Sequence, residues 1–140
     1  MQITPYLSLD GRCEEAIKFY EKTLGAKVGM MMRFKDSPEP QSGMAPPGND
    51  NKIMHAHLTV GGHSLMLSDG RCGGKPVFQG ITLSLAVKTD KEAEKLFKAL
   101  GKDGQVQMPM ATTFFASRFG MVADKFGVGW MVITETPTKE

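Results

Sequence analysis

The sequence predicts an α+β domain in which two βαβββ modules form a largely antiparallel, eight-stranded sheet around a cleft. Three observations lead to this prediction. The segment Glu-Ala-x-Lys-Phe-Tyr at residues 15–20 is echoed by Glu-Ala-x-Lys-Leu-Phe at residues 92–97. A Leu-Gly pair follows each segment, and each half ends in an apolar hairpin. Finally, 140 residues suffice for one ordinary core but not for two independent domains of typical size.

The first module covers about residues 1–69, and its elements follow from the spacing of its apolar side chains. Alternation at period two indicates strands, whereas apolar residues three and four positions apart indicate a helix. Asp10-Gly11 ends the first strand, and Gly25 stops the helix. The predicted elements are a strand at 3–9, a helix at 13–24, a strand at 27–34, and a hairpin of strands at 53–60 and 63–68.

The second module covers about residues 80–135 and repeats this order, so both modules belong to one domain spanning residues 1–140. Thr89 or Asp90 is suited to cap its helix. The predicted elements are a strand at 81–88, a helix from Thr89-Asp90 to about 100, and strands at 106–110, 114–124 and 128–134. Four prolines and two glycines predict a long loop at residues 36–51, and a second loop at residues 70–80 joins the modules.

Strand alternation divides the side chains between a face that receives the helices and the opposite face. The opposite face is rich in hydroxyl groups and methionine and holds two histidines. Such a face is too polar for an ordinary core and too apolar for open solvent, which suits the wall of a ligand cleft. The predicted helix side includes Ile3, Leu7, Leu9, Ile81 and Trp130, and the cleft side includes Tyr6, His55, His57, Met66, Ser68, Thr82, Ser84 and Met131.

Composition argues against several classes of partner. The net charge is +2 and basic residues are scattered among acidic ones, which argues against nucleic acid. No apolar run approaches the ~20 residues that cross a bilayer, and no secretory signal is visible. Cys13 and Cys72 form no Cys-x-x-Cys or zinc-type spacing. One disulfide is formally possible, but two free thiols in a cytoplasmic protein are the more economical interpretation.

Several motifs lie along nearly the whole chain in a fixed order. They include Tyr6-Leu7-x-Leu9-Asp10-Gly11, Cys13-Glu14-Glu15-Ala16-Ile17, Lys52-Ile53-Met54-His55-Ala56, Leu65-Met66-Leu67-Ser68-Asp69, Arg118-Phe119-Gly120-Met121 and Asp124-Lys125-Phe126-Gly127-Val128. In this order they resemble the vicinal-oxygen-chelate superfamily of glyoxalase I, bleomycin-resistance proteins and extradiol dioxygenases, and more narrowly its PhnB-like branch. The resemblance implies a glyoxalase-like fold and a homodimer in which modules of two chains complete each cleft.

The same resemblance bears on methyl transfer and on metal binding. The PhnB-like branch often carries the label of a demethylubiquinone methyltransferase, yet this sequence has no glycine-rich strand–turn–helix for S-adenosylmethionine. Metal-using members of the superfamily take ligands, usually His or Glu, from the first, fourth, fifth and eighth strands. The positions implied here are Thr4 or Tyr6, Met66, Thr82 and Met131. Because none suits a hard cation, and thioethers suit soft metals instead, we expect no metal and no cofactor.

His55 is the candidate catalytic residue, because an unperturbed imidazole titrates near neutral pH. The alternative is a buried histidine that ties strands to a loop. His55 and His57 share one strand face and would hold a divalent ion only if a carboxylate converged on them. The carboxylates considered are those of Asp69, Asp124 and Glu135.

Arginine and aromatic side chains add to the candidate binding set. Arg33 and Arg118 suit a bidentate clamp on an anionic ligand, or structural ion pairs with Asp124 or Asp36. Phe115 is predicted to reach the cleft or a partner subunit. The complete predicted set is Tyr6, Arg33, His55, His57, Met66, Ser68, Thr82, Ser84, Phe115, Arg118 and Met131.

Three functions follow from these predictions. The first is the binding of a small molecule of unknown identity in the inter-module cleft, without the usual superfamily metal. The alternative is a lyase or isomerase that uses His55 as base, with or without a divalent ion at His55 and His57. The third is a dimeric structural or regulatory module without a ligand.

Overall fold

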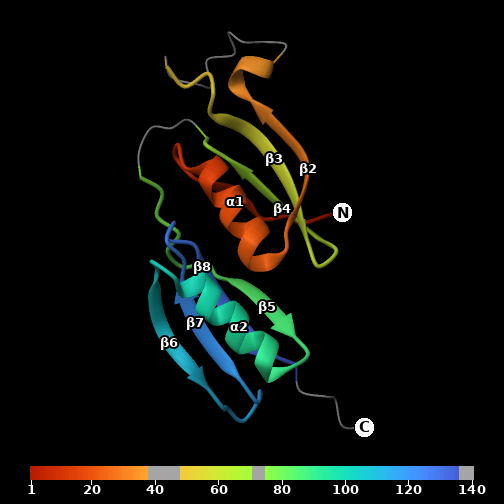
Figure 1. Ribbon diagram of the computed structural model, residues 1–140, viewed down its shortest axis with the longest axis vertical. Helices are drawn as coiled ribbons and strands as arrows, with labels where there is room; N and C mark the ends of the chain where they lie inside the picture. The colour runs from red at the N-terminus through yellow and green to blue at the C-terminus, as the bar shows by residue number, and fades with distance from the viewer. Residues whose placement is uncertain (38–47, 71–74, 136–140) are drawn as a thin grey trace. The chain divides into compact units, whose positions relative to one another are not determined.

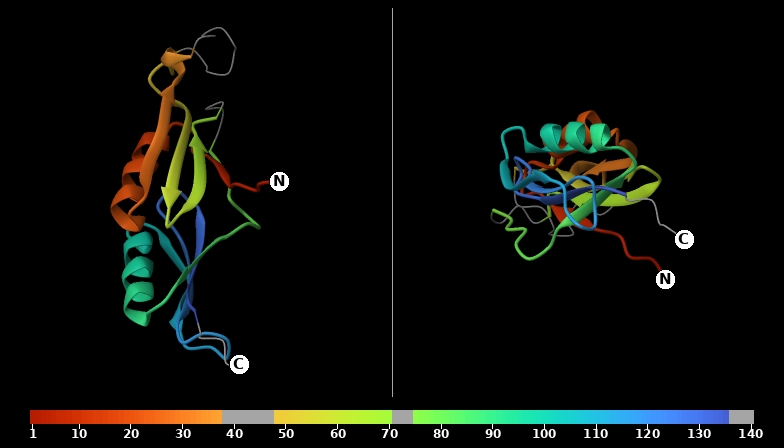
Figure 2. Two further views of the ribbon diagram at one scale, coloured as in Figure 1. Left: turned by 90° about the vertical axis from the view of Figure 1, so that its right-hand side faces the viewer. Right: turned by 90° about the horizontal axis from the view of Figure 1, so that it is seen from below.

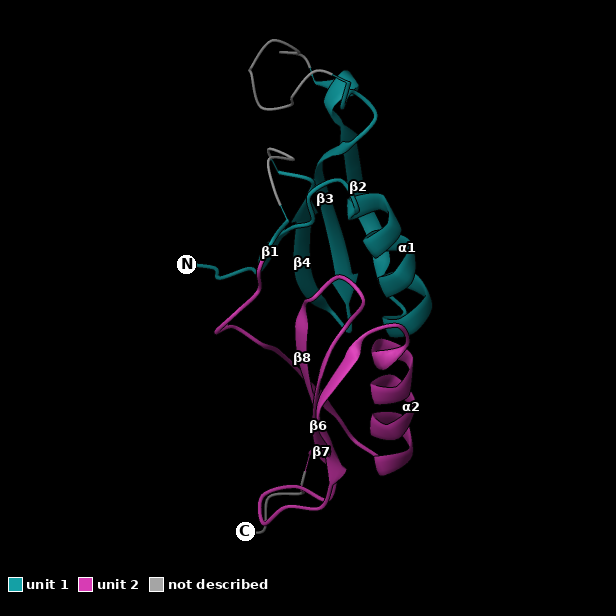
Figure 3. Ribbon diagram, turned by 90° about the vertical axis from the view of Figure 1, so that its left-hand side faces the viewer, with its two compact units in different colours: residues 1–76 teal, residues 77–140 magenta. Residues whose placement is uncertain are grey.

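The described part of the protein consists of two four-stranded mixed sheets, each with a helix on one face (Figures 1 and 2). This computed structural model describes residues 1–37, 48–70 and 75–135. The chain divides into two compact units, residues 1–76 and residues 77–140, coloured teal and magenta in Figure 3. Both units have the order βαβββ, which confirms the predicted α+β class.

Unit 1 places its first strand beside its last. The sheet order is β1-β4-β3-β2, in which β1 runs parallel to β4 and the other neighbours are antiparallel. Tyr6 is level with Met66 across the parallel pair. The elements are β1 (Tyr6–Ser8), α1 (Cys13–Leu24), β2 (Lys27–Arg33), the 3-10 helix η1 (Phe34–Asp36), β3 (Ile53–Val60) and β4 (His63–Ser68).

Unit 2 repeats this arrangement. Its sheet order is β5-β8-β7-β6, again with the first strand parallel to the last. Thr89 caps α2 as predicted, because its hydroxyl accepts a hydrogen bond from the Glu92 N–H at 3.2 Å. The elements are β5 (Leu83–Val87), α2 (Asp90–Gly101), β6 (Gln105–Ala111), β7 (Phe119–Ala123) and β8 (Gly129–Thr134).

Apolar side chains under each helix form the cores. In unit 1 the buried stripe of α1 contains Cys13, Ala16, Ile17 and Tyr20. The predicted alternation holds for β3 and β4, where Ala56, Leu58, Leu65 and Leu67 are buried. In unit 2 the buried residues include Ala93 and Leu100 of α2 with Val122, Trp130 and Val132 of the sheet.

Three predicted strands begin two or more residues too early. Pro5 accepts a hydrogen bond from the Met66 N–H but has no N–H of its own, so β1 begins only at Tyr6 and Ile3 is exposed. Ile81 likewise precedes β5 and is exposed. The strand predicted at 114–124 begins at Phe119, because the Thr113 hydroxyl accepts from the backbone at Phe115 and Ala116 and holds a turn there.

One buried aspartate in each unit holds backbone groups together. Asp69 accepts from the N–H of Cys13 at 2.8 Å and of Ile53 at 2.7 Å, which joins the start of α1 to the start of β3. Asp124 accepts from the Trp130 indole at 2.8 Å and from two backbone N–H groups of the β7–β8 turn. Both carboxylates therefore have structural partners.

Within the described ranges, no helix is long and apolar enough to cross a membrane.

Candidate functional site

The sheet face of unit 1 opposite α1 holds most of the predicted site residues of that unit. Strand register sets four side chains level across the sheet: Tyr6 on β1, Met66 on β4, His57 on β3 and Met30 on β2. A second row brings Ser8 level with Ser68, and Met32 level with His55. Residues directly opposite on neighbouring strands share one face, so the register gathers hydroxyl, imidazole and thioether groups there.

Tyr6 and His55 form a hydrogen-bonded pair on this face. The Tyr6 hydroxyl lies 3.1 Å from Nδ1 of His55, and the ring centroids are 5.5 Å apart. The two residues belong to β1 and β3, so their side chains meet across the intervening β4. Because an imidazole bonded at Nδ1 has its ring orientation fixed, the contact presents Nε2 of His55 in a defined direction.

Ser68 and His57 complete the polar part of this face. Ser68 is buried, and its hydroxyl oxygen accepts from the Gly70 N–H at 2.7 Å. Its hydroxyl hydrogen can still be donated, since Ser carries both a donor and acceptors. His57 is half-buried beside Met66 and Met30. The structure therefore brings five predicted residues of unit 1 to one face: Tyr6, His55, His57, Met66 and Ser68.

Arg33 points to α1 rather than to these residues. Its guanidinium donates to Glu14 through Nη1 at 3.1 Å and Nη2 at 2.6 Å, and Nη1 also donates to the Asn51 carbonyl oxygen at 2.8 Å. Asp36 accepts from the Arg33 backbone N–H. The hydrogen bond from Arg33, more than burial, sets the pKa of Glu14, which lies below its usual 4.5. The bidentate fork of Arg33 thus already holds a carboxylate of its own chain.

Replacement of Glu14 by Gln is expected to reduce the difference in unfolding free energy between pH 7 and pH 3. A carboxyl with a lowered folded pKa stabilises the fold above its unfolded pKa, and this stabilisation is lost as pH falls through the folded value. The Glu14 side chain is 42% exposed, so the expected change is below about 1 kcal/mol. Urea unfolding at both pH values measures it. Glu21→Gln on the same helix is the control; an equal change there would contradict the assignment to the Arg33 pair.

The predicted residues of unit 2 lie in two places, near the β5–β8 pair and in the segment before β7. Ser84 is level with Met131 across the parallel β5–β8 pair, whereas Thr82 precedes β5. Phe115 lies in the turn before β7 and packs edge-to-face on Phe119, with centroids 5.1 Å apart. Arg118 bonds to Glu94 of α2 at 3.0 Å and to the Thr112 hydroxyl at 2.7 Å, instead of to Asp124 or Asp36. The cleft that the sequence predicts between the two modules stays a prediction.

Four methionines on these faces were absent from the predicted set. They are Met30, Met32, Met108 and Met121. Strands β2 and β6 each contain register shifts, between Val28 and Met30 and between Val106 and Met108. A bulge interrupts the alternation of period two, so the facing of residues beyond it does not follow from spacing alone. The sequence signal that could have found these residues is the repeat of the two modules, because β2 and β6 carry the same register shift at equivalent positions.

The donor atoms do not fit a hard divalent cation of the kind that the superfamily resemblance implies. Tyr6 is level with Met66 and Ser84 with Met131, which gives a hydroxyl and a thioether in each unit. Across residues 1–37, 48–70 and 75–135, no group of three or more His, Cys, Asp or Glu side chains is placed to hold a metal ion. Asp69 accepts from backbone N–H groups with both of its oxygens.

A family model described as 3-demethylubiquinone-9 3-methyltransferase matches residues 1–133. The chain belongs to this family. Protein YjdN of Escherichia coli is 37% identical, and the match covers 99% of this chain and 100% of YjdN. Relatives of this family in Mycobacterium include the uncharacterised protein Mb0911c of Mycobacterium bovis, which is 33% identical over 91% of this chain and 79% of its own length.

Solved structures agree with the family assignment. Protein PA1353 from Pseudomonas aeruginosa is 45% identical with a TM-score of 0.85, covering 96% of this chain and 98% of that chain. The PhnB protein from Bacillus cereus is 26% identical with a TM-score of 0.77, covering 96% and 99%. A glyoxylase/bleomycin resistance/dioxygenase domain from Frankia, at 18% identity and a TM-score of 0.66, shares the fold. The predicted PhnB-like membership is therefore confirmed, and the glyoxalase-like fold is shared with the Frankia domain.

Proposed function

We propose that this protein binds a small organic molecule on the sheet face of unit 1 opposite α1, without the hard divalent metal of its superfamily. The observation that supports this proposal best is the Tyr6–His55 pair. The Tyr6 hydroxyl lies 3.1 Å from Nδ1 of His55, on a face lined by methionine thioethers. The family description names methyl transfer, but the sequence has no glycine-rich strand–turn–helix for the methyl donor. Binding is the function that the side chains support.

The chemistry of the face indicates the class of ligand. Tyr6 and His55 offer a donor and an acceptor side by side, and the buried Ser68 hydroxyl adds a donor. Met66 and Met32 provide flexible, polarisable walls that adapt to flat or irregular apolar groups. We therefore expect a ligand with an apolar, preferably aromatic, body and one hydrogen-bonding group. Binding sites of this type combine a mostly apolar lining with few polar contacts.

The variants His55→Ala and Tyr6→Phe are expected to weaken ligand binding about tenfold each, the cost of one hydrogen bond. Ligands are first found by a thermal-shift screen in metal-free buffer, because any binder of the folded state raises the melting temperature. Affinities are then compared by isothermal titration calorimetry. The matched control is His63→Ala, an exposed histidine level with Val60. Loss of binding in the control, or none in the other two variants, would contradict the proposed site.

A second candidate function is an isomerase or lyase that uses His55 as general base. The Tyr6 contact at Nδ1 supports it, because a base oriented by a hydrogen-bonded partner is the usual arrangement for proton transfer. Ligands from the screen are incubated with the protein and followed by proton NMR. Turnover that His55→Ala abolishes while binding persists supports catalysis, and an unchanged ligand supports binding alone.

We also propose that the protein forms a homodimer. The strands β2 and β6 support this, since each lies at an edge of its sheet and they expose Val28, Met31 and Val106. Apolar edge strands are normally covered in stable proteins. Sedimentation velocity distinguishes a dimer from a monomer and so tests this proposal.

A further inference from the structure

The two units carry sulfur and nitrogen donors at equivalent places on their sheets. In each unit, three donor side chains lie level across the last three strands of the sheet order, on the face opposite the helix. We name these sets row 1 and row 2. Row 1 is Met66, His57 and Met30 on β4, β3 and β2; row 2 is Met131, Met121 and Met108 on β8, β7 and β6.

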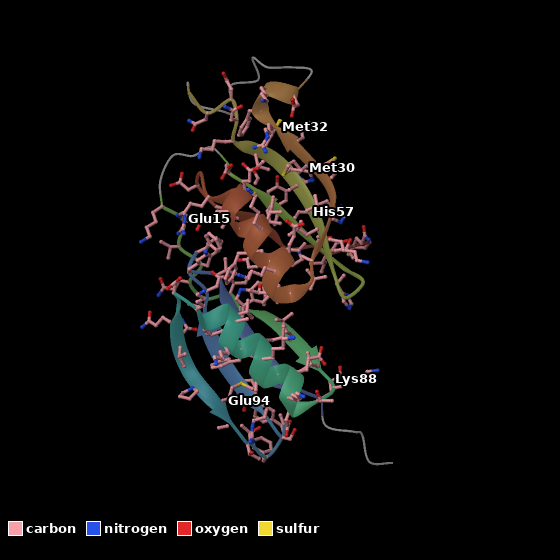
Figure 4. The ribbon with its side chains drawn as sticks, in the orientation of Figure 1. Glu15, Met30, Met32, His57, Lys88 and Glu94 are labelled. Carbon is pink, nitrogen blue, oxygen red and sulfur yellow. The ribbon has the colours of Figure 1, made fainter. Side chains whose placement is uncertain are left out.

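The register brings the three donors of each row within reach of one ion. Cβ atoms of directly opposite residues on neighbouring strands are about 4.5–5.5 Å apart, so the central residue has a donor on either side. Methionine has three rotatable bonds, which allow its sulfur to swing toward the central residue. Figure 4 shows Met30, Met32 and His57 along β2 and β3. Met30 and Met108 are 44% and 45% exposed, so solvent reaches the outer end of each row.

The donor chemistry selects a soft ion. Row 1 offers two thioethers and one imidazole, and row 2 offers three thioethers. Thioethers bind Cu(I) and related soft cations, whereas Mg²⁺, Ca²⁺ and Mn²⁺ prefer carboxylate, carbonyl and water oxygens. Neither row contains a carboxylate. We propose that each row binds one soft monovalent cation, Cu(I) or Ag(I), row 1 through sulfur and nitrogen and row 2 through sulfur alone.

This proposal differs from the proposed function in its ligand and in the contact that carries it. The small-molecule proposal rests on the Tyr6–His55 hydrogen bond, whose two residues belong to neither row, although Met66 lines both sites; its screen contains no metal. Unit 2 has its own row and no counterpart of the Tyr6–His55 pair, because Ser84 stands level with Met131 where Tyr6 stands level with Met66. Failure of silver binding therefore leaves the small-molecule result unaffected, and the reverse also holds.

Silver titration followed by methionine-methyl NMR tests the proposal. The protein is labelled with ¹³C at the methionine methyl groups and titrated with silver nitrate in chloride-free buffer. The expected result is a shift of the methyl signals of both rows that saturates at one Ag(I) per row, with the Met31 signal unmoved. Met31 is level with Ala56 on the opposite face of β2, so it reports silver that binds methionines without selection.

Two variants make the test specific. Met30→Leu removes one sulfur of row 1 with little change of volume, and it should weaken silver binding in that row at least tenfold while row 2 is unchanged. Met31→Leu, equally exposed on the same strand, should have no effect. Equal weakening by both variants would overturn the proposal. So would silver uptake that leaves the methyl signals of both rows in place, because groups other than these methionines would then bind the ion.

Discussion

Replacing Asp124 by Asn is expected to lower the free energy of unfolding by about 2–4 kcal/mol. Asp124 is 3% exposed, and its carboxylate accepts from the N–H of Phe126 at 2.9 Å, of Val128 at 3.1 Å and of the Trp130 indole at 2.8 Å. Asparagine keeps one oxygen that can accept a hydrogen bond. Its NH₂ group takes the place of the other oxygen, so one N–H donor of the protein then faces a second donor. A buried N–H is then left without an acceptor, which is the costly part of the change.

Urea unfolding followed by fluorescence of the single tryptophan measures this effect directly, since Trp130 is itself a partner of Asp124. The control is Asp103→Asn, which removes the same charge from an exposed residue. Asp103 has a φ of 61°, and asparagine tolerates this left-handed conformation. We expect the control to stay within about 0.5 kcal/mol of the wild type. A similar loss in both variants would assign the effect to net charge instead of to the three hydrogen bonds.

Replacing Gly104 by Ala is expected to destabilise the protein by about 2–4 kcal/mol for a steric reason. A Cβ at this position would overlap the Ala123 carbonyl oxygen and lie 3.0 Å from two backbone atoms of Asp124. These atoms belong to the backbone, so no rotamer change relieves the overlap. Gly104 comes immediately before β6, and the overlap falls on the end of β7 with which β6 pairs.

Gly29→Ala is the matched control for this substitution. Gly29 lies in β2, the strand of unit 1 that corresponds to β6, and a Cβ there would lie 3.6 Å from the His57 carbonyl oxygen. That distance is an ordinary van der Waals contact, so the expected change is below about 1 kcal/mol. Chemical denaturation of both variants measures the difference. Equal stability of the two variants would contradict the steric prediction, because it would show that the backbone of β6 and β7 shifts at little cost to accommodate the methyl group.

Much of the fold could be predicted from spacing because local rules and tertiary packing agree there. The helix α1 was placed at its observed bounds, since Gly25 adopts a left-handed φ of 67° and ends it. The facing of β3 and β4 followed from strict alternation. Tyr6 and His55 were assigned to one face by the same rule, although the hydrogen bond between them could not be predicted, because it crosses an intervening strand.

The partners of the arginines could not be predicted in the same way. Arg33 and Arg118 were weighed against aspartates, whereas the structure pairs each with a glutamate of the helix in its own unit. Spacing fixes the face on which an arginine lies, but its long side chain reaches several carboxylates, and the crossing of helix over sheet decides among them. Met30 and Met108 were missed for a different reason, because bulges in β2 and β6 shift the alternation just before them.

The parallel pairing of β1 with β4, and of β5 with β8, has a consequence for how the chain folds. In each unit the first strand of the chain pairs with the last one, so the sheet is not complete until its final strand is available. Unit 1 reaches this point at Ser68, before any strand of unit 2 has been synthesised. The contact that closes each sheet is also the one most distant in sequence, and such contacts slow folding. A ribosome-bound chain could therefore complete its first half while the second is still being made.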